Sequence, residues 1–204
     1  MNHLAHALLA APDADLMVGS LIGDFVRGAI DPALPPGVQA GVALHRAIDG
    51  YTDAHVQVVA ARALIAPPLR RYAGVLLDIW FDHLLARGWA THGTGSLADF
   101  SRGVRTLLDA NADLLPVRMH GFVAYMHAND LPAAYGDTAM IARVLHGVSQ
   151  RFSRENPVAG ALPVLLSLEV PLARHFDAFF PELQAFASEQ RARLVDAFPR
   201  NDRK

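Results

Sequence analysis

The segment Leu76-Leu77-Asp78-Ile79-Trp80-Phe81-Asp82-His83-Leu84-Leu85 places two carboxylates and an imidazole among large apolar side chains. It belongs to a longer run with helical spacing, Leu69–Trp89. Residues three or four apart share one face of a helix, so Asp78 and Asp82 can meet at one point. An ionised carboxylate among leucines and aromatic rings is costly unless it is paired or bound to a metal. The segment therefore predicts a buried helix whose carboxylates are paired or bind a metal.

Other predicted helices in the first half of the chain present polar groups in the same way. Asp24 stands in the apolar run Leu21–Arg27, His45 and Asp49 lie four residues apart, and His6 falls within the first apolar stripe. Helical bundles build metal sites from side chains on facing helices. The sequence has no cysteine, and a mixture of imidazole and carboxylate without sulfur suits manganese, iron, magnesium or zinc in a hydrolytic role.

Each of these groups also has an ordinary structural interpretation. A His45–Asp49 pair is common as a contact on a helix surface. The two carboxylates of the apolar segment could instead form buried salt bridges, with Arg27, Arg46 or Arg87 as partners. The argument for a metal is that four predicted helices carry such groups together. The residues alone leave a metal site and a set of buried ion pairs both open.

Signals for helices dominate the chain and signals for strands are scarce. There is no alternating Val/Ile/Thr run and no Asn-Gly or Asp-Gly turn. Helical spacing recurs over residues 4–11, 13–27, 36–49, 54–64, 69–89, 96–116, 117–128, 133–150 and 162–198, the last interrupted by Pro163, Pro171 and Pro181. We therefore expect an all-α fold, with a single domain of about eight or nine helices over residues 1–204.

Composition narrows the function classes. The 204 residues are 52% hydrophobic, with a formal net charge of −2. No apolar run approaches the roughly 18 residues of a membrane span, so no membrane association is expected. The apolar patch Ala7–Ala11 has no basic residue before it, which argues against a secretory signal and for the cytoplasm. The charge balance argues against nucleic acid as a partner.

Several sequence blocks carry a resemblance to a known family. The blocks are Met1-Asn2 with Leu4-Ala5-His6, Gly23–Gly28, His45–Asp53, Leu77–Leu85, Val144–Arg151 and Phe176–Leu183. Together they resemble the acyl carrier protein phosphodiesterases over essentially the whole chain. The resemblance implies a helical fold related to the HD phosphohydrolases. It also implies a divalent metal, manganese in the first place and Mg²⁺ or Fe²⁺ as alternatives.

The resemblance further implies a reaction and a set of site residues. The reaction removes 4′-phosphopantetheine from holo acyl carrier protein, which makes that protein the expected partner. The implied metal positions are Asp24, His45, Asp49, Asp78, Asp82 and His83, with His6 as a further candidate. The residues expected to act on the substrate are Asp24, Arg27 and Arg46, with the two arginines as phosphate contacts. His83 or His6, if not bound to the metal, is the expected acid for the leaving oxygen.

Two other functions and one surface remain as expectations. The chain could be a metal phosphohydrolase of the same broad fold acting on a nucleotide or another small phosphate ester. It could also be a non-catalytic helical binding module in which the acidic residues form buried ion pairs.

Acyl carrier proteins are acidic, so the segment Arg62–Arg71, with Arg62, Arg70 and Arg71, is a candidate docking surface. The sequence predicts no oligomeric state.

Overall fold

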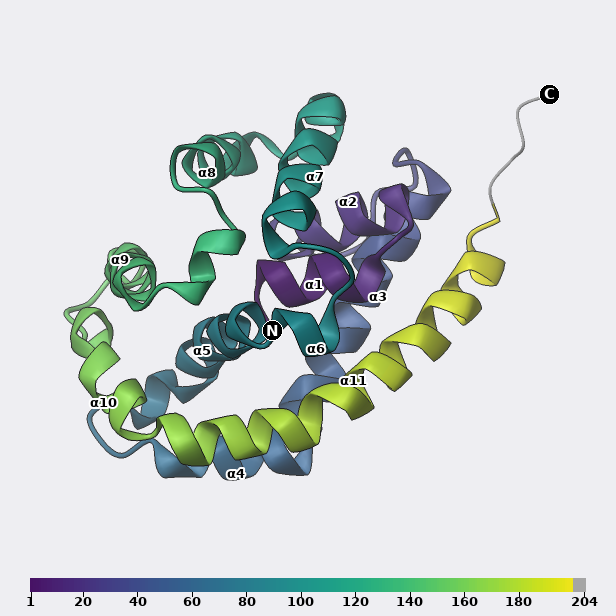
Figure 1. The fold of residues 1–204 in the computed structure, drawn as a ribbon. Coiled ribbons are helices and arrows are strands. Elements are labelled where there is room, and N and C mark those ends of the chain that lie inside the picture. The colour runs from purple at the N-terminus through teal and green to yellow at the C-terminus, as the bar shows by residue number, and fades with distance from the viewer. Residues whose placement is uncertain (200–204) are drawn as a thin grey trace.

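The computed structural model describes residues 1–199, and the elements in that range are helical (Figure 1). The α-helices are α1 His3–Ala10, α2 Ala14–Ile22, α3 Pro36–Ala54, α4 Val56–Leu64, α5 Ala73–Arg87, α6 Trp89–His92, α7 Leu97–Ala110, α8 Val117–Ala128, α9 Thr138–Ser149, α10 Leu162–Ser167 and α11 Glu169–Ala197. Short 3₁₀ helices are η1 Gly23–Phe25, η2 Arg70–Tyr72, η3 Ala112–Leu114, η4 Ala133–Gly136 and η5 Val158–Gly160. The all-α prediction is confirmed.

The number of helices differs from the predicted eight or nine because some predicted segments divide. The run 133–150 splits into η4 and α9, since the Asp137 side chain accepts a hydrogen bond from the Ala139 amide and starts a new helix. The run 162–198 splits into α10 and α11. Pro181, expected to divide the last helix, lies inside the continuous α11. The single-domain prediction extends to residue 204, and residues 200–204 lie outside the described part.

Several helix starts follow the local signals in the sequence. The Asp13 carboxylate accepts a hydrogen bond from the Leu16 amide at 3.1 Å and caps α2. Ser96 caps α7 in the same way through the Asp99 amide. Helix α3 begins at Pro36, where the missing N–H of proline costs nothing.

Helix α1 lies at the centre of the molecule, in contact with α2, α3, α5 and α11 (Figure 1). Helix α5 is apolar almost all round and is correspondingly buried along most of its length. The long helix α11 packs along α3 and α4, whereas α9 contacts α5 away from α11 in Figure 1. None of the described helices is both long and apolar enough to cross a membrane.

Two glycines allow α2 and α3 to pack unusually close. A Cβ added at Gly19 would lie 2.1 Å from the Val38 carbonyl oxygen, and one added at Gly41 would lie 2.4 Å from the Leu16 carbonyl oxygen. In both cases the obstacle is backbone, which cannot turn aside as a side chain can. The close approach brings the end of α2, with Ser20, against the middle of α3, with His45.

Gly19→Ala is therefore expected to lower the free energy of unfolding by about 2 kcal/mol or more, because the extra methyl overpacks a backbone contact. For a chain of this size the loss corresponds to a fall in Tm of about 5 °C. Gly103→Ala in α7 is the matched control. The Cβ there meets open space, so the helix should gain up to about 1 kcal/mol. Equal stability of Gly19→Ala and the unchanged chain in urea unfolding would contradict the close packing.

Candidate metal centre

Two histidines and an aspartate from α1 and α3 converge on one point. His6 Nε2 lies 3.2 Å from one Asp49 oxygen, and His45 Nε2 lies 3.1 Å from the other. One ligand atom from each residue lies within 4.8 Å of the others. The two imidazole rings stack with centroids 4.0 Å apart. The predicted His45–Asp49 pair thus meets a histidine from a different helix.

The orientation of His45 is fixed from behind. Its Nδ1 donates to the Ser20 carbonyl oxygen at 2.8 Å, which the close packing of α2 on α3 brings into reach. This bond places the hydrogen on Nδ1 and leaves Nε2 to face Asp49. Metal-binding histidines are commonly held in this way by a carbonyl on the nitrogen away from the metal.

Asp24 reaches the same point from η1, directly after α2. One of its oxygens lies 3.5 Å from His45 Nε2, and the carboxylate remains substantially exposed. Gly23 makes this approach possible, since a Cβ there would lie 2.2 Å from the His45 ring. Asp24 therefore forms the open side of the centre, next to solvent.

Asp78 lies beside the centre. Its carboxylate is 3.0 Å from the Met1 nitrogen, which is in turn 3.5 Å from Asp49. Burial raises the pKa of Asp78, and the positive charge at Met1 opposes that rise. Asp78 is thus connected to Asp49 through a shared contact.

Asp82 and His83 were both expected at the metal, but in the structure each makes a different contact. Both Asp82 oxygens accept backbone hydrogen bonds from the start of α1, from the Leu4 amide at 2.7 Å and the Ala5 amide at 3.2 Å. His83 is buried on another side of α5, with Nδ1 donating to the Tyr135 carbonyl oxygen at 2.7 Å. The centre formed by His6, His45 and Asp49 therefore does not include this pair.

The predicted phosphate-binding arginines also separate. Arg27 is exposed beside Asp24 and lines a cavity described below. Arg46 instead donates to the carbonyl oxygens of Val26 and Gly28, and so holds the loop that carries Arg27. Its observed contact is with the backbone of that loop.

The three arginines of the candidate docking segment differ in exposure and in their contacts. Arg62 is half-buried and forms an ion pair with Asp53. Arg70 and Arg71 are exposed, and the Arg71 guanidinium lies over the Tyr72 ring, 4.9 Å from its centroid. Arg62 is therefore engaged within the chain, and the other two remain available at the surface.

The charges of the centre depend on each other. Burial lowers the pKa of His45, but the hydrogen bonds that its Nε2 donates to the Asp24 and Asp49 carboxylates outweigh burial and raise the pKa to about 9. Burial and the neighbouring His45 lower the pKa of His6 to about 4. The His45 hydrogen bond lowers the pKa of Asp24 to about 2. Burial acts to raise the pKa of Asp49, but its two histidine contacts lower it overall. Both carboxylates are thus anionic at neutral pH.

These residues fit a divalent cation. Two imidazole nitrogens and a carboxylate converge from different helices, and this donor set suits manganese, iron or zinc. His6 Nδ1 is buried without a hydrogen-bond partner among the described residues. No contact at Nδ1 therefore fixes which ring nitrogen carries the hydrogen, and Nε2 can serve as a ligand. An anionic pocket edge with convergent donors is what a cation requires.

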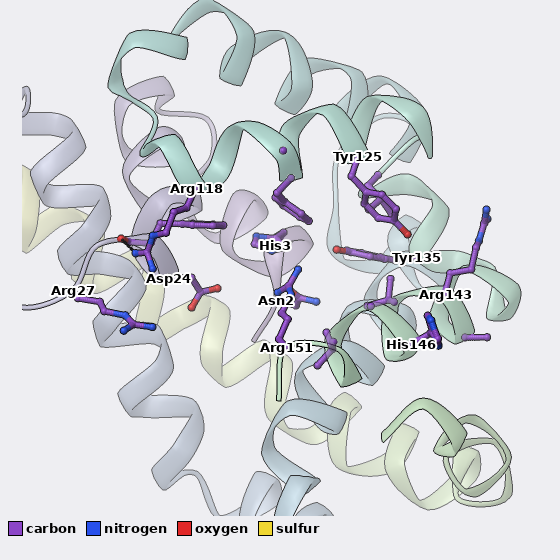
Figure 2. A pocket seen from close by; sticks show the side chains of 18 residues that line it. Asn2, His3, Asp24, Arg27, Arg118, Tyr125, Tyr135, Arg143, His146 and Arg151 are labelled. Carbon is purple, nitrogen blue, oxygen red and sulfur yellow. Dashed lines mark hydrogen bonds between the residues drawn. The ribbon is translucent and has the colours of Figure 1, made fainter. Parts of the chain in front are cut away.

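A cavity of about 1150 Å³ opens beside Asp24 (Figure 2). In Figure 2, Asp24, Arg27 and Arg118 lie at one end, and Arg143 and His146 lie at the other. The walls come from the start of α1, from η1, from η4 and from the facing sides of α8 and α9. The sequence-based candidates did not include Arg118, Tyr135, Arg143 or Arg151. The one available signal was the family resemblance of Val144–Arg151, which forms one wall.

Comparisons with known proteins show the family of the chain. A family model described as acyl carrier protein phosphodiesterase matches residues 1–183. A relative of that name from Yersinia enterocolitica is 31% identical over 192 residues, covering 94% of this chain and 100% of the relative. Another from Photorhabdus laumondii is 32% identical over 191 residues, covering 93% and 94%. No solved structure shows a significant match. The chain belongs to the acyl carrier protein phosphodiesterase family.

Proposed function

We propose that this chain is a metal-dependent phosphodiesterase that converts holo acyl carrier protein to its apo form. The bond broken joins the 4′-phosphopantetheine phosphate to a serine oxygen of the carrier. Family membership, with a match over residues 1–183, supports the substrate. The observation that carries the chemistry is the convergence of His6, His45 and Asp49, with Asp24 open to a cavity lined by arginines.

His6, His45 and Asp49 are the residues proposed to hold the metal, with manganese as the proposed ion. When bound, a divalent metal supplies electrostatic stabilisation of phosphate charge and activation of water. Asp24 lies 3.5 Å from His45 and faces solvent, so it is placed to approach the same ion or to orient the attacking water. Its low pKa keeps it as a hydrogen-bond acceptor at neutral pH.

Charged side chains around the cavity supply the remaining contacts. Arg27 is the proposed donor to the phosphate oxygens, because it lines the cavity beside Asp24. Of the two histidines proposed as an acid for the leaving serine oxygen, His6 lies at the centre and His83 lies against Tyr135. Because His6 is proposed to hold the metal and burial lowers its pKa to about 4, the proposal assigns the acid to neither histidine.

The family match favours the carrier-protein activity over both alternatives, a small phosphate ester hydrolase and a non-catalytic binding module. The proposal includes a cytoplasmic location and a role in the turnover of carriers for fatty acid synthesis. An intact-mass assay tests it directly. Holo acyl carrier protein incubated with the chain and Mn²⁺ should lose the mass of phosphopantetheine, and a chelator should prevent the loss. Unchanged carrier with Mn²⁺, Mg²⁺ and Fe²⁺ would refute the activity.

Metal binding should be visible without any substrate. At a Mn²⁺ concentration 100 times its Kd, binding stabilises the fold by about 2.7 kcal/mol, which corresponds to a rise in Tm of about 5–10 °C. His6→Gln removes one proposed ligand and should abolish most of that rise. The matched control is His127→Gln, because His127 is exposed and pairs with Asp109 outside the centre. A full rise in His6→Gln would exclude His6 as a ligand.

A further inference from the structure

We propose that the cavity between α8, α9 and the start of α1 is the channel that binds the pantetheine arm of the substrate. The phosphate end would lie at Asp24, Arg27 and Arg118, and the thiol end toward Arg143 and His146. This inference rests on the proposed function and deepens it, since it assigns a substrate-binding role to the half of the chain that lies outside the metal centre.

The position of the cavity is the first argument. It begins at Asp24, the exposed member of the centre, and extends past His3 to the space between α8 and α9 (Figure 2). Its volume of about 1150 Å³ is slightly above the range of about 300–1,000 Å³ that is usual for small-molecule sites, which leaves room for an elongated ligand. A ligand that fills it would therefore have one end at the metal centre and its body along the channel.

The lining matches a chain with one charged end and a largely uncharged body. Four arginines line the cavity, namely Arg27, Arg118, Arg143 and Arg151, against the single acidic side chain of Asp24. The side chains of Arg27 and Arg151 have no hydrogen-bond or ion-pair partner among residues 1–199. The remaining wall is mostly apolar or aromatic: Phe25, Phe122, Tyr125, Leu131, Tyr135, Val144 and Val148. The pantetheine arm combines a phosphate with methyl groups and two amides, which need such a surface with a few polar contacts.

Tyr135 supplies a polar contact in the middle of the channel. The residue is only 2% exposed, and its hydroxyl has no hydrogen-bond partner among the described residues. Figure 2 shows this hydroxyl directed toward the middle of the cavity. Burial raises the pKa of Tyr135, so it remains a neutral donor. His83 holds the Tyr135 backbone through the carbonyl contact at 2.7 Å. An amide carbonyl of the arm is the acceptor that this donor fits.

Two helical glycines line the channel. Gly121 of α8 and Gly147 of α9 line the cavity, and a Cβ added at either would meet no atom within 4 Å. Glycine inside a helix is less stable than alanine by up to about 1 kcal/mol, and packing gives no reason for it at either position. Both positions therefore offer room for a larger side chain to enter the channel.

The first test fills the channel. Gly121→Trp and Gly147→Trp should each lower kcat/KM for holo acyl carrier protein at least about tenfold, which corresponds to about 1.4 kcal/mol. The matched control is Gly103→Trp, because Gly103 of α7 also faces open space but does not line the cavity. The Mn²⁺-dependent rise in Tm should persist in all three variants. That result shows that the metal centre and the fold are intact.

The second test measures binding rather than turnover. Free 4′-phosphopantetheine should bind the unchanged chain at least about tenfold more tightly than inorganic phosphate in calorimetry. Either tryptophan variant should remove that advantage. Tyr135→Phe keeps the packing but removes the donor, so it should weaken 4′-phosphopantetheine binding about 3- to 10-fold and leave phosphate binding unchanged.

The outcomes separate the channel from the activity. Full kcat/KM in both tryptophan variants would overturn the channel while the proposed function stands. Equal affinity for phosphate and 4′-phosphopantetheine would also overturn it, because the cavity would then be only an anion site. If the unchanged chain fails to release phosphopantetheine from the carrier, the proposed function fails. The calorimetry still decides whether the cavity binds the arm.

Discussion

Asp49→Asn is expected to lower kcat/KM for holo acyl carrier protein by about 1000-fold or more, with little loss of helical content. Asp49 contacts both histidines, through one oxygen each, at 3.2 and 3.1 Å. Asparagine keeps the size but replaces one oxygen by an NH₂ group and removes the charge. Loss of metal-supplied stabilisation of about 4 kcal/mol corresponds to roughly 1000-fold in rate.

The matched control for this variant lies one turn further along α3. Asp53→Asn changes an exposed carboxylate that pairs with Arg62, outside the centre, and should leave kcat/KM within about twofold. The Mn²⁺-dependent rise in Tm should disappear in Asp49→Asn and persist in Asp53→Asn. If Asp49→Asn retained more than a tenth of the activity, the centre would have to be placed elsewhere.

Local spacing was sufficient to predict the helices and part of the centre. The four-residue spacing of His45 and Asp49 places both side chains on one face of α3 whatever surrounds that helix. Asp24 lies in an apolar run, yet its carboxylate is substantially exposed and lies 3.5 Å from His45 Nε2, so the cost of burying a charge does not explain its place in the centre. The pairing of His6 with this face depends on how α1 crosses α3, which no local pattern specifies.

The same limit explains the different environments of Asp78 and Asp82. Both lie on one face of α5, and sequence spacing treats them alike. The three-dimensional structure separates them, because Asp82 meets the start of α1 and Asp78 meets the Met1 nitrogen next to Asp49. The cavity was outside the reach of the sequence for a similar reason. Two of its walls come from α8 and α9, whose lining residues lie more than 90 residues from Asp24 in the chain.

Asp82→Ala is expected to destabilise the fold by about 3–5 kcal/mol in the absence of metal. The Asp82 carboxyl is fully buried and accepts hydrogen bonds from the Leu4 and Ala5 amides, so its removal leaves two buried donors without acceptors. Hydrogen bonds to charged groups contribute about 1.5–3 kcal/mol each. Burial raises the pKa of Asp82 to about 7, and the amides oppose the rise. In either protonation state the carboxyl offers acceptors to the start of α1.

The corresponding fall in Tm is about 10 °C, measured by circular dichroism in the presence of a chelator. Asp82→Asn keeps one acceptor oxygen and should lose about half as much, which keeps the test usable if the alanine variant does not fold. The Mn²⁺-dependent rise in Tm should survive in whichever variant folds. A metal ligand at this position would give the reverse pattern, with little change in chelator and no rise with Mn²⁺. The expected pattern, in contrast, would mean that Asp82 acts on the metal site indirectly. Its carboxylate anchors α1, and α1 carries His6 into the centre, so Asp82 stabilises the site without contacting the ion.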